Sequence, residues 1–271
     1  MHVGTLLRFG GWVTVSSLVG PLMVIGDRFI IGAIANAKAV AYYTIPFQLG
    51  ERSAVIPSSL ASALFPRLTG SAPPEARRMA LDSLDMLVTV MTPLIAGAIL
   101  LIGPFLTWWI DPQFASHSTR VGQVILLGFW VNSFAKIPYA QLQARGRPDL
   151  VATCHLSELL PYFLLLYVGM HLFGLLGAAI AYSIRVLLDF LLLAGFAGVL
   201  GETLPRLAAP ALLLTAAMAV AVWLPSGSPA WFAASFLGLL ATTAWTWHWA
   251  PVRLRSRALA LLGSKRVEAN D

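Results

Sequence analysis

Apolar runs long enough to cross a membrane recur along almost the whole of this sequence. Hydrophobic residues make up 58% of the chain and charged residues 11%, whereas about 25% of residues are charged in a typical soluble domain. A helix of about 20 apolar residues spans the ~30 Å hydrocarbon core of a bilayer. A soluble helical bundle would instead need a polar face on each helix. The sequence therefore predicts an all-α, polytopic membrane protein.

About eight transmembrane helices are expected from the positions of these runs. Proline, glycine and aspartate, which break helices, mark the short connections between them. The expected helices are Phe9–Ile34, Val40–Leu64, Leu84–Trp109, Val121–Gln143, Leu150–Leu172, Leu175–Leu200, Arg206–Leu224 and Ala230–Trp249. The segment from Ser71 to Leu84 is too polar to span, and we expect a short helix on the cytoplasmic surface there.

The distribution of lysine and arginine predicts the orientation of the chain, because these residues accumulate on the cytoplasmic side of membrane proteins. Among the basic residues between the predicted spans, only Lys38 and Arg120 fall on one side. The others fall on the opposite side: Arg8, Arg67, Arg77, Arg78, Arg145, Arg147, Arg206 and the basic residues of the C-terminal tail. Both termini are therefore expected in the cytoplasm, and the tail is expected to contact anionic lipid rather than nucleic acid.

Charged side chains inside predicted spans are the most informative residues for function. Each costs about 2.5–3.5 kcal/mol at the bilayer centre, so such residues must face protein or water and mostly pair. Acidic and basic residues are present in equal number: Asp27, Arg28, Glu51, Arg52, Lys136, Glu158, Arg185 and Asp189.

The first group of these charges lies on either side of a turn near Lys38. Asp27 and Arg28 precede the turn by about 10 residues, and Glu51 and Arg52 follow it by about 13. At 1.5 Å per residue their depths nearly coincide, so the pairs Asp27–Arg52 and Arg28–Glu51 are possible. The group either joins two helices or lines a water-filled, ligand-facing cavity, and the second interpretation is favoured. An arginine in such a cavity would suit a phosphate, which its planar guanidinium binds in a bidentate way.

The second group allows two further pairs. Lys136 and Glu158 lie about 11 residues before and after a turn near Arg147, which predicts a common depth. Arg185 and Asp189 are separated by four residues and therefore share one face of a helix. Both pairs can be explained by packing within the bundle, and both can also be explained by ion coupling or substrate contact.

Prolines inside the predicted spans are consistent with either kinked packing or a cavity lined by bent helices. They are Pro21, Pro46, Pro57, Pro93, Pro138 and Pro161.

Signals for enzymatic chemistry are poor, and neither a cofactor nor a metal site is expected. His155 and Glu158 have the spacing of one half of a carboxylate–histidine metal site, but a second half is not found. The single cysteine, Cys154, excludes an intrachain disulfide and a cysteine-rich metal site. The sequence contains no phosphate-binding Walker loop, no HExxH and no Gly-x-Ser-x-Gly.

Four stretches of the sequence resemble a known family. They are "LLRFGGWVTVSSLVGPLMVIGDRFIIG", "VAYYTIPFQLGERSAVIPSSLASALFPRL", "PYAQLQARGRPDL" and "GAAIAYSIRVLLD". In series they are similar to the polysaccharide-unit flippases of the multidrug/oligosaccharidyl-lipid/polysaccharide exporter superfamily. Such flippases have two six-helix lobes around a central cavity. The resemblance implies that residues 1–200 form a second lobe, residues 201–250 an additional two-helix hairpin and residues 251–271 a basic cytoplasmic tail.

The same resemblance implies a function in surface polysaccharide biosynthesis at the bacterial inner membrane. The implied substrate is an oligosaccharide on undecaprenyl pyrophosphate, moved between leaflets by alternating access. Arg28, Arg52 and Arg185 would contact this substrate, while Asp27, Glu51, Asp189, Lys136 and Glu158 would pair charges or couple an ion. Because the implied first lobe is not found in this sequence, transport would need a separate first-lobe chain or a second copy.

Three other functions stay open at this point. The first is a cation-coupled exporter of small organic cations on the same fold, which would favour unpaired carboxylates in its cavity. The second is a membrane glycosyltransferase or polymerase, which would need a large periplasmic loop, whereas the predicted loop from Asp111 to Arg120 is short. The third is a non-transporting remnant or scaffold.

Overall fold

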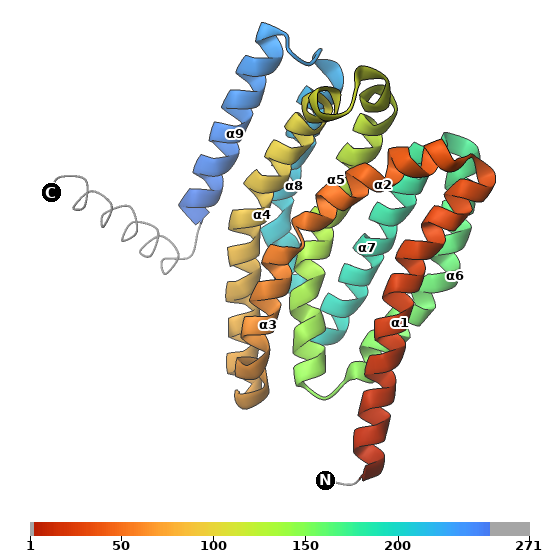
Figure 1. The fold of residues 1–271 in the computed structure, drawn as a ribbon. Coiled ribbons are helices and arrows are strands. Elements are labelled where there is room, and N and C mark those ends of the chain that lie inside the picture. The colour runs from red at the N-terminus through yellow and green to blue at the C-terminus, as the bar shows by residue number, and fades with distance from the viewer. Residues whose placement is uncertain (1–2, 250–271) are drawn as a thin grey trace, which may run out of the picture.

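The protein folds as an up-and-down bundle of helices in the computed structural model, which describes residues 3–249 (Figure 1). The helices of these residues are α1 (Val3–Ile34), α2 (Ala37–Arg52), α3 (Val55–Gly70), α4 (Pro73–Trp109), α5 (Pro112–Ala144), α6 (Pro148–Phe173), α7 (Leu175–Ala197), α8 (Leu200–Trp223) and α9 (Pro229–Trp249). The basic tail predicted for residues 251–271 lies outside the described residues.

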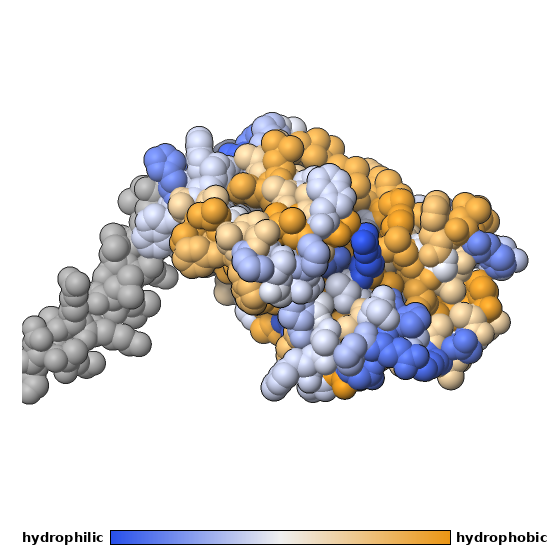
Figure 2. Space-filling view, turned by 90° about the horizontal axis from the view of Figure 1, so that it is seen from above, coloured by the Kyte–Doolittle hydropathy of each residue, from blue (hydrophilic) through white to orange (hydrophobic). Residues whose placement is uncertain are grey.

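Six of the described helices are long and apolar enough to cross a membrane, and they confirm the predicted class of polytopic all-α membrane protein. They are residues Gly10–Ile34 of α1 and the whole of α4, α5, α6, α7 and α8. The predicted spans Val40–Leu64 and Ala230–Trp249 lie outside this set. Seen from one end, the molecule carries hydrophilic residues along one edge and hydrophobic residues along much of the opposite edge (Figure 2).

The predicted helix Val40–Leu64 is not continuous, and this prediction was wrong. It is divided into α2 and α3 by a tight turn at Ser53 and Ala54, whose backbone amides donate to Gly50 and Glu51 three residues earlier. Pro57 favours a break at this point. It has no amide hydrogen to donate to the carbonyl of Ser53, and its ring would clash with that carbonyl in a regular α-helix.

Two further helices are longer than predicted. Most of the expected surface helix, Ser71–Leu84, is continuous with the membrane span, because residues Pro73 to Leu84 form the first part of α4. The expected loop from Asp111 to Arg120 is helical except at its start. Asp111 caps α5, because its Oδ1 atom accepts a hydrogen bond of 2.7 Å from the amide of Phe114. A side-chain cap of this kind satisfies an amide that the first turn leaves without a partner.

The connections alternate between the two ends of the bundle (Figure 1). The α3–α4, α5–α6 and α7–α8 connections lie at the end where α1 begins, and the α1–α2, α4–α5, α6–α7 and α8–α9 connections lie at the other end. This alternation agrees with the predicted separation of Arg67 and Arg147 from Lys38. That the arginine-rich end faces the cytoplasm stays a prediction.

The centre of the bundle is formed by α5 and α7, with α4 and α6 on either side. Helices α6 and α7 approach closely where Gly169 faces Gly177, since a Cβ atom at either position would overlap the backbone of the other. The predicted additional hairpin corresponds to α8 and α9, which pack against α4. An ion pair of 2.9 Å between Arg206 and Asp85 also joins α8 to α4.

Candidate functional site

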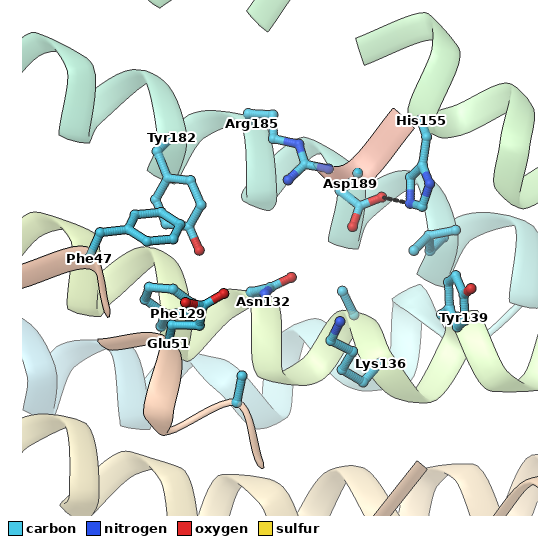
Figure 3. Close-up of a pocket in the computed structure, with 14 residues that line it drawn as sticks. Phe47, Glu51, Phe129, Asn132, Lys136, Tyr139, His155, Tyr182, Arg185 and Asp189 are labelled. Atoms are coloured by element: carbon cyan, nitrogen blue, oxygen red, sulfur yellow. Dashed lines mark ion pairs between the residues drawn. The ribbon is translucent and has the colours of Figure 1, made fainter. Parts of the chain in front are cut away.

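A polar pocket of about 230 Å³ lies between α1, α2, α5, α6 and α7 (Figure 3). It combines cations, carboxylates and aromatic rings inside a bundle whose outer residues are largely hydrophobic. The lining residues are Gly20, Phe47, Glu51, Ala54, Phe129, Asn132, Ala135, Lys136, Tyr139, His155, Tyr182, Arg185, Asp189 and Leu193.

Helical spacing places these side chains in the pocket. Residues three, four or seven positions apart share one face of an α-helix. The pocket-facing sets are Phe47, Glu51 and Ala54 at the end of α2, Asn132, Lys136 and Tyr139 on α5, and Tyr182, Arg185 and Asp189 on α7. The α2–α3 break therefore lies at the edge of the pocket, because Ala54 is within the turn.

Two contacts between a basic and an acidic side chain join α6 to α7 at this pocket. The Nε atom of Arg185 lies 3.2 Å from Oε2 of Glu158. The Nε2 atom of His155 lies 3.4 Å from Oδ1 of Asp189 (Figure 3). Glu158 and Asp189 are both buried. Because a buried charge without a partner is costly, these contacts hold two carboxylates in the interior of the bundle.

The predicted pairs Lys136–Glu158 and Arg185–Asp189 were wrong. Glu158 instead pairs with Arg185, and Asp189 contacts His155. The reason lies in the packing, because α7 contacts both α5 and α6, whereas α5 and α6 touch each other little. Arg185 on α7 is therefore closer to Glu158 than Lys136 on α5 is. The Lys136 ammonium group is left facing the pocket (Figure 3).

Asp27 is a third buried carboxylate, and it connects α1 to α2 and α6. Its Oδ2 atom accepts hydrogen bonds from the hydroxyl groups of Tyr43 at 3.2 Å and Tyr162 at 3.4 Å. Its Oδ1 atom lies 3.5 Å from the guanidinium of the adjacent Arg28. Only 1% of Asp27 is exposed, and Asp27 is not among the residues that line the pocket, so it is part of the helix packing.

The predicted cross-pair Asp27–Arg52 does not form among the described side chains, because Asp27 pairs with the adjacent Arg28 instead, and the pair Arg28–Glu51 stays a prediction. The prediction treated α1 and α2 as a closely packed hairpin and matched depths from their turn. Instead, α1 packs mainly on α6, and α2 crosses the top of the bundle at an angle to α1 (Figure 1). Asp27 therefore meets Tyr43, which precedes Glu51 by two helical turns.

Arg28, Glu51 and Arg52, the other charged residues of this first group, lie nearer to the pocket than Asp27 does. The Arg28 guanidinium stands 5.1 Å from the ring centroid of Phe47, whose side chain lines the pocket. This distance is within the range of a cation–π interaction. Glu51 lines the pocket itself, and Arg52 is exposed at the end of α2.

Two buried polar atoms around the pocket, Nδ1 of His155 and Oε1 of Glu158, have no hydrogen-bond partner among the described residues. The Oδ1 atom of Asp189 has only its 3.4 Å contact with His155. Buried polar groups normally have such partners, from protein or from ordered water. The pocket therefore suits a hydrated or polar ligand better than an apolar one.

Sequence reasoning missed the aromatic wall of the pocket. Phe47, Phe129 and Tyr182 contact one another, with ring centroids 5.0–5.4 Å apart. A signal was present in the sequence, since Tyr182 stands one helical turn before Arg185, and Phe47 one turn before Glu51. Among residues 3–249, the structure contains no cluster of three or more potential metal ligands.

Comparisons with known proteins place the chain among polysaccharide-biosynthesis proteins. The family described as "Polysaccharide biosynthesis protein" matches residues 2–71 of the chain, which form α1, α2 and α3. The chain is also 40% identical over 189 residues to a protein of Shigella flexneri named "Putative O-antigen transporter". That match covers 69% of this chain and 45% of the Shigella protein, so the chain spans about half the length of this relative.

Proposed function

Because the chain belongs to this family of multi-pass polysaccharide-biosynthesis membrane proteins, we propose that it is a lipid-linked oligosaccharide flippase or the C-terminal half of one. The proposed substrate is a glycan on undecaprenyl pyrophosphate. The name of the Shigella relative describes a transporter rather than an enzyme, which agrees with the poor enzymatic signals of the sequence.

The observation that supports this substrate best is the composition of the polar pocket. Lys136 and Arg185 bring two cations to it, and Arg28 lies just behind the ring of Phe47. Cations in a water-poor site bind phosphate oxygens strongly through charge-assisted hydrogen bonds. Phe47 and Tyr182 supply flat apolar surfaces beside these charges, on which the apolar face of a sugar ring can lie.

The charged residues divide into two proposed roles. Lys136, Arg185, Arg28 and Arg52 contact the pyrophosphate or the sugar. The carboxylates of Asp27, Glu51, Glu158 and Asp189 hold these cations in position or take part in ion coupling. Lys136 is the first choice for a direct contact, because its ammonium faces the pocket while Arg185 is shared with Glu158.

Transport in this proposal uses alternating access. The polar pocket lies in one lobe of the transporter, and the lobe rocks against another around the bound head group. The lobe opposite it is a first lobe or a second copy of this one. The site of action is the bacterial inner membrane, with both termini in the cytoplasm.

A cation-coupled exporter of small organic cations is the alternative on the same fold. Its cavity would be dominated by carboxylates without partners. Here Glu158 and Asp189 are each in contact with a basic side chain, and Lys136 faces the same pocket. The lining therefore balances Lys136 and Arg185 against Glu51 and Asp189, which argues against a cavity dominated by carboxylates without partners. A non-transporting scaffold would bind neither class of ligand.

Binding in lipid nanodiscs tests the proposal directly. A fluorescent undecaprenyl-pyrophosphate oligosaccharide should bind the wild-type chain, and Lys136→Gln should weaken binding about tenfold, because one charge-assisted hydrogen bond is lost. Arg120→Gln is the matched control, since Arg120 is exposed on α5 outside the pocket. Equal loss in both variants, or no binding above that of a plain phospholipid, would contradict the proposal.

A further inference from the structure

A second cavity lies on the other side of the α2–α3 break, between α3 and α4. Its volume is about 440 Å³, and it is an apolar groove lined by Val55, Ile56, Ser59, Leu60, Met86, Leu87 and Val90. Val55 and Met86 are exposed at its rim, whereas Leu87 is buried at its floor. The groove is therefore open to the surroundings of the bundle, and its base is part of the hydrophobic core.

The apolar groove and the polar pocket meet at the break between α2 and α3. Ala54 lines the pocket, and Val55, the next residue, lines the groove. Arg52 is exposed at the same junction, on the last turn of α2. One irregular turn thus separates a site suited to a charged, hydrated group from a site suited to hydrocarbon.

We propose that the α3–α4 groove binds the hydrocarbon tail of the same lipid whose polar head occupies the pocket. This inference rests on the proposed function, because it requires an amphipathic ligand. A head group held in the pocket fixes the start of its tail close to Arg52 and Val55. Because the head group is already bound, the attached tail has a high effective concentration at the groove. It therefore competes well there with the acyl chains of the surrounding lipid.

The groove adds specificity through packing rather than through the hydrophobic effect. Lipid chains are as apolar as the groove, so transfer from the bilayer gains little by itself. What the groove offers is close van der Waals contact, which is small for each atom pair and large when summed over many. A long polyprenyl tail should therefore bind more tightly than a short tail on the same head group.

Filling the groove tests this inference with a closely matched control. In Ser59→Trp an indole would occupy the groove, whereas Ser58→Trp places the same side chain on an exposed neighbouring position that does not line it. Both variants should keep the wild-type melting temperature, since both serines are exposed. Binding is measured in nanodiscs for a polyprenyl-pyrophosphate glycan and for a short-tailed analogue with the identical head group.

Ser59→Trp should weaken binding of the long-tailed ligand about fivefold, through lost tail contacts. It should leave the short-tailed ligand unchanged, and Ser58→Trp should leave both unchanged. If Ser59→Trp changes both ligands equally or neither, the groove is not the tail site, while the proposed function stands. If the wild-type chain binds neither ligand, the proposed function itself fails and the groove assignment fails with it.

Discussion

The Nε atom of Arg185 lies 3.2 Å from Oε2 of Glu158, so one ion pair joins α7 to α6 inside the bundle. Arg185→Met should lower the free energy of unfolding by about 3–5 kcal/mol, because it leaves a buried carboxylate without its cation. Thermal unfolding in detergent measures this loss.

The double variant Arg185→Met, Glu158→Leu separates stability from binding. It removes both charges together and should recover most of the lost stability, because apolar replacement of a buried pair is often neutral. Binding of the lipid-linked glycan should stay impaired, since the pocket loses a cation. A double variant as unstable as the single one would contradict this role of the pair.

The close contact between Gly169 on α6 and Gly177 on α7 can be tested by substitution. Gly177→Ala should lower the free energy of unfolding by about 1–3 kcal/mol, because the added methyl group would overlap the carbonyl oxygen of Gly169. Gly195→Ala on the same helix is the control, since a Cβ atom there meets nothing within 4 Å. Similar melting temperatures for the two variants would show that α6 and α7 are not in close contact.

Asp27 should act mainly through the packing of α1. Tyr43→Phe and Tyr162→Phe each remove one hydrogen bond to its carboxylate, and each should lower the free energy of unfolding by about 1 kcal/mol. Tyr167→Phe, on the exposed face of α6, should be neutral. Denaturant or thermal unfolding gives the comparison. Unchanged stability in both Asp27-contacting variants would exclude this packing role.

The membrane topology can be measured with introduced cysteines. The one native cysteine, Cys154, is buried and should react little with a membrane-impermeant maleimide. Ser226→Cys in the α8–α9 connection should label from outside intact spheroplasts, and Arg147→Cys at the α5–α6 connection only after the membrane is opened. Labelling of both positions from the same side would contradict the predicted orientation.

Helix type and membrane class followed from the sequence because they depend on long apolar runs, which are local features. The break at Ser53 was harder to predict. Pro46 and Pro57 look alike in the sequence, yet Pro46 lies within a continuous helix, whereas α3 begins just after the turn beside Pro57. A proline can be accommodated by a bend or can end a helix, and the neighbouring packing decides between these outcomes.

The pairing of charges depended on which helices touch, which residue spacing alone does not determine. Lys136 and Glu158 share a depth, but α7 brings Arg185 closer to Glu158. The pocket itself was only partly predicted, since Arg185 and Asp189 line it while Asp27 does not. Tyr182 and Phe129 are ordinary core residues by sequence, and only the fold places them beside these charges.

Transport by reconstituted protein tests the central claim most directly. The purified chain is placed in vesicles, alone and together with a first-lobe chain, with a fluorescent lipid-linked oligosaccharide in both leaflets. We predict that the glycan lipid crosses the membrane when both lobes are present and that Lys136→Gln slows this movement while Arg120→Gln does not. Vesicles that accumulate small organic cations but never move the glycan lipid, with or without the first lobe, would contradict the account.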